Sequence, residues 1–299
     1  MADWRYGIGE KMGCLPPVQI ISKCASTGIY KVGLSSQEML IRGFMAGTYV
    51  AMGAALATTV MTGTEASLGA GLAKFMLGAT FPVGLIIISL TGAELFTGDA
   101  MFAPLAAFVH KITWGPILKL WALVYIGNLV GSLFFAYLMA NGPLVSFAAD
   151  GTAAVNAFGM TAISIASDKV SYVGLMGMWS LFLKAICCNW IVNLAVFLSI
   201  CADDVTGKIL GIWFPIMAFA TTGFEHCIAN MYFIPTGIMT LAQQPDVMAA
   251  AGAQVSSNLN WVGMWTNNII LATIGNIIGA MFFVAFLYWI GFKRELDSL

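Results

Sequence analysis

One histidine stands in the middle of a long apolar segment, where an ionisable side chain is costly and usually has a function. This residue, His226, is one of two histidines in the chain, and Glu225 directly precedes it. Imidazole gains or loses a proton near neutral pH. His226 is therefore a candidate for binding an anion, passing a proton or setting a pH dependence. Glu225 is either its proton partner or a side chain that ties down nearby backbone or side-chain groups.

Further polar side chains interrupt the apolar stretches. Thr97 offers a hydroxyl group within one of them. Asn189 and Asn193 are four residues apart, so they share one face of a helix. Asn230 follows His226 by one helical turn. Such side chains in a membrane either bond helices to one another or line a polar pathway, and the sequence leaves both interpretations open.

The sequence lacks the residue patterns that metal sites, haem sites and the common enzyme active sites require. A lone buried histidine with one glutamate, and no cysteine pair at ligand spacing, makes a poor metal site. The sequence has no second mid-span histidine for haem, no Ser-His-Asp arrangement and no phosphate-binding loop. We therefore predict no metal, no cofactor and no enzymatic activity.

Composition places these residues in a membrane. Of 299 residues, 60% are hydrophobic and 9% are charged, against roughly 25% charged residues in an ordinary soluble domain. A soluble protein of this length needs more polar groups to cover its surface. The composition excludes a soluble enzyme, a nucleic-acid-binding protein and a disordered chain, and it predicts an all-α integral membrane protein.

Six apolar segments are long enough to cross a bilayer. They cover residues 40–62, 75–109, 115–140, 173–201, 209–242 and 262–292. We predict an N-terminal segment at 1–35, a six-span domain at 36–293 and a C-terminal tail at 294–299. The first 35 residues contain no apolar run suited to a signal peptide, so we expect the first span to direct membrane insertion. A short amphipathic helix is expected around 16–30.

The basic residues predict the orientation. Ten of the 13 fall on the side of the two termini, and three, Lys74, Lys169 and Lys184, fall on the other. Basic residues favour the cytoplasmic side. We therefore expect a multi-pass protein of the cell membrane with both termini in the cytoplasm.

The chain contains an internal repeat. Residues 91–104 read TGAELFTGDAMFAP and residues 222–235 read TGFEHCIANMYFIP, at a constant offset of 131. Residues 126–135 (IGNLVGSLFF) similarly match 274–283 (IGNIIGAMFF). Two units of three spans, at about 36–140 and 173–292, insert in opposite directions and form an inverted repeat. This architecture is typical of channels and secondary transporters.

The second and fifth segments carry the T-G-x-E motif and are too long for one plain crossing. We predict that each is an interrupted helix, broken at Leu95–Asp99 and at Phe224–Cys227, with Gly98 allowing an unusual backbone conformation. Irregular backbone at membrane depth survives only where protein or a polar cavity satisfies it. The exposed N-terminal helix ends attract anions.

At these residues the chain resembles the formate–nitrite transporter family. The resemblance rests on G-x-E-L-F-T-G at 92–98, C-N-W at 188–190 and G-F-E-H-C-I-A-N-M at 223–231, and it covers about residues 20 to 293. It implies an aquaporin-like fold with six spans, a pore in each protomer and assembly as a homopentamer in the lipid bilayer.

The resemblance also implies residue roles. Thr97 and His226 resemble the central pair that faces the permeating anion, and Asn189 resembles the residue that supports the interrupted loop. Lys169 resembles a vestibule lysine, although its distance from Asn189 leaves Lys184 as a competitor. Two hydrophobic constrictions around the central pair are implied at Phe81, Leu85, Leu95, Val192 and Phe219.

The resemblance implies a channel or transporter for small monovalent weak-acid anions, with formate the favoured substrate. We expect protonation at the central pair of Thr97 and His226 to aid permeation. Desolvation makes it costly for an unpaired anion to enter a hydrophobic constriction, whereas the protonated, neutral acid avoids most of this cost. Nitrite and hydrosulfide are alternative substrates within the same family. An aquaporin-like neutral-solute channel lacks its paired N-P-A loops here, and an ammonium-type channel favours two mid-span histidines. A membrane-embedded subunit of a larger enzyme is the third alternative.

Overall fold

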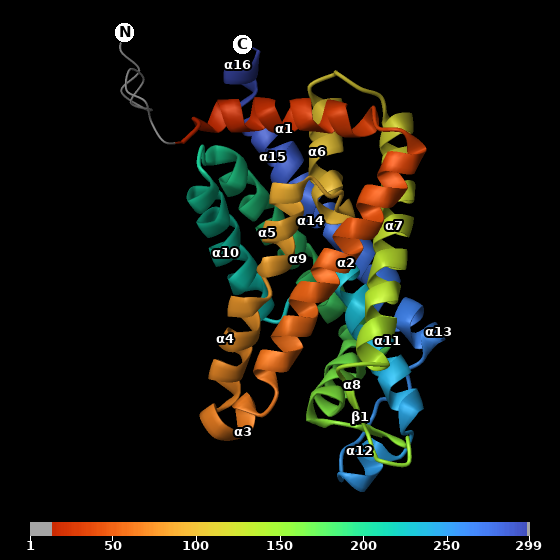
Figure 1. Ribbon diagram of the computed structural model, residues 1–299. Coiled ribbons are helices and arrows are strands. Elements are labelled where there is room, and N and C mark those ends of the chain that lie inside the picture. Colours follow the sequence, from red (N-terminus) through yellow and green to blue (C-terminus); the bar gives the residue numbers. More distant parts are fainter. Residues whose placement is uncertain (1–13, 298–299) are drawn as a thin grey trace.

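The computed structural model describes residues 14–297 as a bundle of long helices with one short hairpin (Figure 1). The first half contains α1 (Pro17–Val32), α2 (Ser36–Met61), α3 (Thr64–Leu68), α4 (Ala70–Thr80), α5 (Val83–Thr91), α6 (Phe96–Phe108) and α7 (Trp114–Ala140). The connection contains β1 (Val145–Phe147), β2 (Ala153–Val155) and α8 (Ala157–Lys169).

The second half contains α9 (Gly174–Cys201), α10 (Val205–Thr221), α11 (Cys227–Gln243) and α12 (Val247–Ala250). Its last crossing is one helix with two π-helical segments. It consists of α13 (Trp261–Met264), η1 (Trp265–Ile269), α14 (Ile270–Ala280), η2 (Met281–Phe286) and α15 (Leu287–Gly291), and α16 (Lys293–Leu296) follows.

Within residues 14–297, five helical stretches are long and apolar enough to span a membrane: Ser36–Met61, Ala70–Thr91, Trp114–Ala140, Gly174–Cys201 and Trp261–Gly291. The shorter apolar helix Val205–Thr221 begins the remaining predicted segment, and α11 completes it. The predicted all-α membrane fold is confirmed. The division into N-terminal segment, channel domain and tail stays a prediction.

Both interrupted helices are present, and one break differs from its predicted position. The chain leaves helical conformation between Thr91 and Phe96, and again between Thr221 and Cys227. The predicted first break at Leu95–Asp99 is therefore about three residues too late. Thr97 and Asp99 instead lie in the first turn of α6.

The glycines that turn the chain at the breaks are also not the predicted Gly98. They are Gly92 and Gly223, at φ 77° and 74°, and they occupy equivalent positions in the two repeats. A positive φ costs glycine little because it has no Cβ. This explains why T-G is shared by both copies of the motif.

The repeated G-N-x-x-G sequence lets helices approach closely in each half. A Cβ atom at Gly131 of α7 would collide with the Phe44 carbonyl oxygen, and one at Gly279 of α14 would collide with that of Ile186. Small residues spaced by four allow such contact between membrane helices. As a result, Asn128 and Asn276, in the same two motifs, come close enough to bond the backbone of neighbouring segments.

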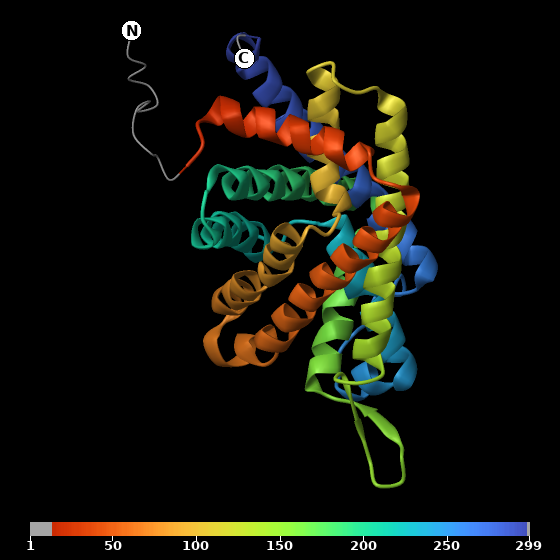
Figure 2. The same cartoon turned by 45° about the horizontal axis from the view of Figure 1, so that its top comes forward.

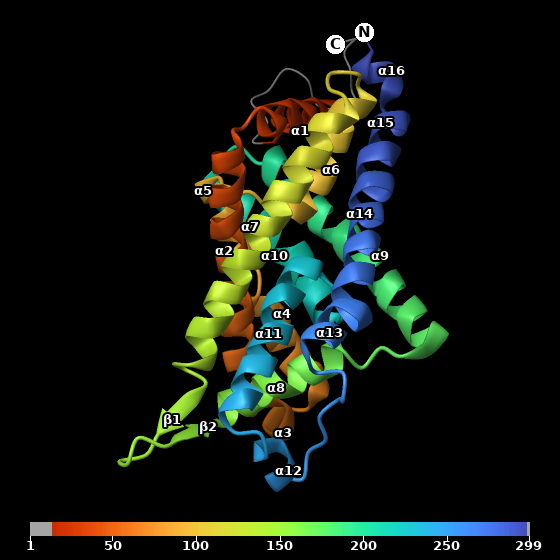
Figure 3. The same ribbon diagram turned by 90° about the vertical axis from the view of Figure 1, so that its right-hand side faces the viewer.

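The helix α1 lies across one end of the bundle, over the ends of the long helices (Figures 1 and 2). It agrees with the amphipathic helix expected around 16–30. Ile21 and Cys24 are buried on the side that packs against α6. The hairpin β1–β2 and α8 lie at the opposite end, and α8 packs against α11 (Figure 3).

Candidate functional site

Thr97 and His226 meet where the two interrupted helices come together. Thr97 is in the first turn of α6, and His226 caps the N-terminus of α11. The Thr97 Oγ1 atom lies 3.1 Å from His226 Nε2. Both residues are buried. The structure therefore brings the predicted central pair into direct contact, one residue from each repeat.

The hydrogen-bond pattern fixes the direction of this contact. The backbone N–H of Ala229 donates to His226 Nδ1 at 3.1 Å. Because Nδ1 accepts, a neutral imidazole carries its hydrogen on Nε2 and donates it to Thr97. The Thr97 hydroxyl hydrogen then remains to be donated to a third group. A small anion between the helix ends would be such an acceptor.

The Thr97 backbone is held by the predicted asparagines. Asn189 Nδ2 donates to the Thr97 carbonyl at 3.1 Å and to the Asn276 carbonyl at 2.8 Å. Asn193 Nδ2 also donates to the Thr97 carbonyl, at 3.2 Å. All three asparagines are buried. Asn189 therefore positions the central pair through the backbone, as the family resemblance implies.

Two cavities approach the central pair from opposite ends. The α8-side cavity, of about 270 Å³, is lined by Lys169, Tyr172, Phe81, Phe219 and His226 among others. The α1-side cavity, of about 320 Å³, is lined by Lys31, Arg42, Glu94, Leu85, Leu95 and Val192 among others. A space of about 20 Å³ lies between them.

The five predicted constriction residues surround that small space. Phe81 and Phe219 also line the α8-side cavity, whereas Leu85, Leu95 and Val192 also line the α1-side cavity. The Phe81 and Phe219 rings pack edge to face, with centroids 5.6 Å apart. The residues that line the central space are thus apolar except for His226, which also lines the α8-side cavity. Thr97 contacts His226 from α6 but is not among the residues that line these three spaces.

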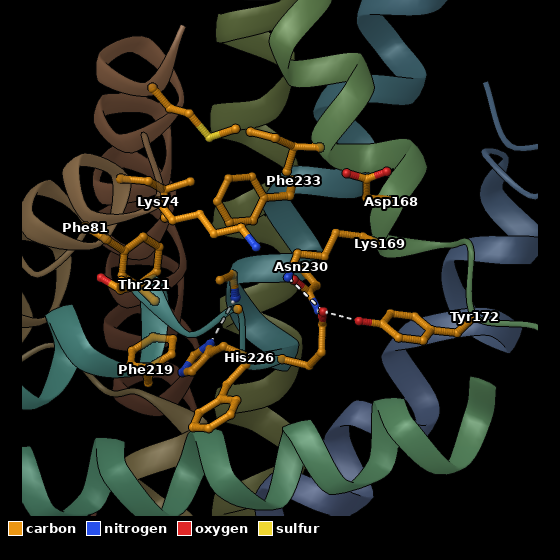
Figure 4. A pocket seen from close by; sticks show the side chains of 18 residues that line it. Lys74, Phe81, Asp168, Lys169, Tyr172, Phe219, Thr221, His226, Asn230 and Phe233 are labelled. Atoms are coloured by element: carbon orange, nitrogen blue, oxygen red, sulfur yellow. Dashed lines mark hydrogen bonds and ion pairs between the residues drawn. The ribbon is translucent and has the colours of Figure 1, made fainter. Parts of the chain in front are cut away.

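A buried ion pair stands at the α8-side break. Lys169 Nζ donates to Glu225 Oε1 at 3.0 Å, and Asn230 Nδ2 donates to Oε2 at 2.7 Å (Figure 4). Tyr172 donates its hydroxyl to Oε1 at 2.9 Å. Burial and the Glu225 carboxylate raise the pKa of the Tyr172 hydroxyl, so it remains a donor. Lys169 faces this cavity, whereas Lys184 bonds the Tyr172 oxygen at 3.0 Å.

A corresponding cluster stands at the α1-side break. Lys31 of α1 forms ion pairs with Glu94 and with Asp99, the latter at 2.9 Å. Arg42 Nη1 lies 4.0 Å from the other Glu94 oxygen. The helix α1 is therefore tied to the first interrupted helix by buried charges.

Comparison with known proteins places the chain in a family. The profile of the formate/nitrite transporter family matches residues 18–290. The chain belongs to the formate/nitrite transporter family. It is 36% identical to a "Probable formate transporter" of Methanothermobacter thermautotrophicus over 93% of this chain and 97% of that protein. It is 32% identical to "Formate channel FocA" of Escherichia coli strain K12, over 95% and 96%.

Solved structures agree with this formate/nitrite transporter assignment. A "Pentameric formate channel with formate bound" aligns with a TM-score of 0.73 at 30% identity, covering 86% of this chain and 98% of that one. An "FNT family ion channel" aligns with a TM-score of 0.75 at 28% identity, covering 91% and 98%. The predictions of family, of an aquaporin-like channel fold and of a transport protein rather than an enzyme are confirmed.

Sequence reasoning missed several residues of this formate/nitrite transporter. Asn128 and Asn276 donate hydrogen bonds to backbone carbonyls at the two breaks. Their equivalent positions in the repeat could have predicted this role. Tyr172 and Asn268 contact Glu225 at 2.9 and 3.3 Å, from segments that carry no motif. Lys31 lies in the N-terminal helix, where charge alone does not indicate a partner 63 residues away.

Proposed function

We propose that this chain conducts small monovalent weak-acid anions, formate first, with a proton taken up at the central Thr97–His226 pair. The observation that carries this proposal is the apolar surrounding of His226. His226 lines a small space whose other lining residues are apolar, and a cavity lined by charged residues lies beyond that space on each side. A neutral solute has no need of such vestibules, and a permanently charged one would face both dry rings unaided.

The expected sequence of steps follows from the cost of desolvation. Moving an unpaired anion into an apolar ring costs several kcal/mol at least. The Lys169 ammonium group raises the local concentration of anions at the α8-side entrance. The Thr97 hydroxyl and the backbone N–H groups at the helix ends then bind the anion. A proton from water or through His226 neutralises the acid, which crosses the second constriction uncharged.

The choice of formate rests on relatives that are named as a formate transporter and a formate channel, and on a structural neighbour with formate bound. Aromatic constrictions also favour solutes of this size. Nitrite and hydrosulfide remain the second candidates, since both are small monovalent anions of weak acids and would meet the same central pair.

We further propose that the chain assembles as a homopentamer in the cell membrane with both termini cytoplasmic. The pentameric neighbour supports the assembly. The excess of basic residues on the side of the termini supports the orientation. In this orientation the α1-side cavity opens toward the cytoplasm.

Flux of formate, nitrite, hydrosulfide and lactate into proteoliposomes between about pH 5 and about pH 8 tests the proposal, because this range brackets imidazole titration. We expect formate to pass fastest, lactate slowest and empty liposomes to leak little. His226→Phe should weaken the pH dependence of formate flux, while Phe108→Leu, a control remote from the pathway, should leave it as in wild type. Wild-type pH dependence in the His226 variant would remove His226 from the proposed mechanism.

A further inference from the structure

The buried cluster at the α1-side break holds more acid than base. Lys31 donates to both Glu94 and Asp99, so two carboxyl groups share one ammonium group. With all three groups ionised, the cluster carries one excess negative charge. Asp99 is fully buried, and its Oδ2 atom has no hydrogen-bond partner among the described residues. Excess charge and an unpaired oxygen in such a place are costly.

The equivalent cluster in the other repeat is balanced. Asn230 occupies the place of Asp99 and donates its amide to Glu225 at 2.7 Å. Glu225 is matched there by Lys169, so the pair is neutral. The two ends of the pathway therefore differ by one ionisable group at corresponding positions.

The surroundings of Asp99 leave few other groups to offset its charge. Arg42 of α2 lies 4.0 Å from Glu94 but is 28% exposed, so water weakens its effect. Trp121 of α7 donates to the Asp99 carbonyl rather than to its carboxyl group. Cys24 of α1 belongs to the apolar cluster around Ala100 and Met101. The same cluster presents apolar side chains from α9, α14 and η2: Val196, Phe197, Ala280 and Val284.

We propose that Asp99 binds and releases a proton beside Lys31 and Glu94, and thereby sets the charge that the α1-side cavity presents to an entering anion. This inference rests on the proposed anion transport. At low pH the proton comes from water, the cluster is neutral, and Lys31 can attract an anion into the cavity. At high pH the proton returns to water, and the excess negative charge opposes entry from this end alone.

Asp99→Asn fixes the cluster in its neutral state and tests the claim. Formate uptake is measured in right-side-out and inverted vesicles, with the external pH raised from about 5.5 to about 7.5. For entry from the α1 side, the ratio of variant to wild-type flux should rise about tenfold, the size expected for one unit charge at this range. For entry from the α8 side, the ratio should stay constant. Asp150→Asn, the same substitution in the exposed hairpin, should leave both ratios constant.

Asn230→Asp is the converse change. It places a second carboxyl group beside Glu225 and Lys169, so entry from the α8 side should become weaker as pH rises. In infrared difference spectra of a pH step, the C=O band of a protonated buried carboxyl should be present in wild type and absent in Asp99→Asn. The Asn230→Asp fluxes and the carboxyl band of the wild type do not require the Asp99→Asn protein. They test the inference even if that variant fails to assemble, because a wild type without the band, or Asn230→Asp flux that does not fall as pH rises, would overturn it.

Failure of this inference is distinct from failure of the proposed function. If wild-type protein moves no formate, the proposed function is wrong. If it moves formate and the Asp99→Asn ratio stays within about twofold at every pH, Asp99 does not control entry. The carboxyl band persisting in Asp99→Asn, or a band loss without any change in flux, would equally overturn the inference.

Discussion

The two interrupted helices share their backbone supports and differ in their chemistry. At one break, Asn128 donates to the carbonyls of Gly43 and Glu94 and accepts from the N–H of Phe96. At the other break, Asn276 makes the same three contacts, with Ala185, Glu225 and Cys227. Each pair of partners corresponds in the repeat.

The side chains that face the pathway are not repeated. His226 corresponds to Leu95, and Thr97 corresponds to Ile228, at the same offset of 131. Each half therefore contributes one member of the central pair and an apolar residue in the other place. This arrangement gives one polar site at the centre instead of two. The asparagines that bond the backbone at the breaks, Asn128 and Asn276, are thus the same in both repeats. Thr97 and His226, at the proposed solute site, are not repeated.

The largest effect is expected from the shared supports. Asn276→Ala leaves buried backbone groups unpaired at one break, and Asn128→Ala does so at the other. With each unsatisfied buried group costing about 1–3 kcal/mol, either variant should lose at least about 3 kcal/mol of stability. Thermal unfolding in detergent and the yield of assembled protein measure this loss.

Equal losses in the two asparagine variants would mean that both repeats depend on the same scaffold. A loss in one variant and a wild-type melting profile in the other would break the equivalence. Asn141→Ala, which removes an exposed amide at the end of α7, is the matched control and should change stability little.

Much of the scaffold follows from the sequence because it is periodic and repeated. Span lengths, both T-G-x-E motifs and the G-N-x-x-G pairs are local patterns. They predict the five spanning stretches, and they predict that two helices are interrupted although not the position of the first break. The position of the first break at Gly92 cannot be predicted in this way, because Thr97-Gly98-Asp99 contains equally plausible turn residues. Its position depends on the hydrogen bonds of Asn128 from α7 to Glu94 and Phe96, which are tertiary contacts.

The charged clusters are harder to predict for the same reason. Lys169 and Glu225 are 56 residues apart, and Lys31 and Asp99 are 68 apart. At such separations no local pattern indicates that the lysine and the carboxylate are partners. A lysine outside a predicted span is also typical of an ordinary solvated surface. The central pair was accessible because a histidine and a threonine inside interrupted spans are costly unless they have a role.

A smaller effect, on flux rather than folding, is expected from the unrepeated pair. Thr97→Val keeps the shape of the side chain and removes its hydroxyl. Loss of one hydrogen bond to a charged group should lower formate flux by about tenfold or more. Thr97→Ser should retain most of the flux because it keeps the donor. Equal flux through the valine and serine variants would show that the hydroxyl group does not bind the anion.

The smallest effect concerns the lysines at the α8-side entrance and decides between them. Lys169→Gln should lower formate flux by about threefold to tenfold at low ionic strength, because it removes one of the two lysine charges that line this cavity, Lys74 being the other. Lys184→Gln is the matched control and should change flux less, since its ammonium group bonds Tyr172.

Salt distinguishes attraction of the anion from damage to the Glu225 cluster. An electrostatic effect of Lys169 should shrink as ionic strength rises toward about 1 M, where the screening length falls to about 3 Å. A defect that persists at high salt would mean that Lys169 serves mainly to neutralise buried Glu225. Lys169 would then be a structural partner of the break, like Asn276, and the α8-side entrance would attract anions no better than the α1-side entrance.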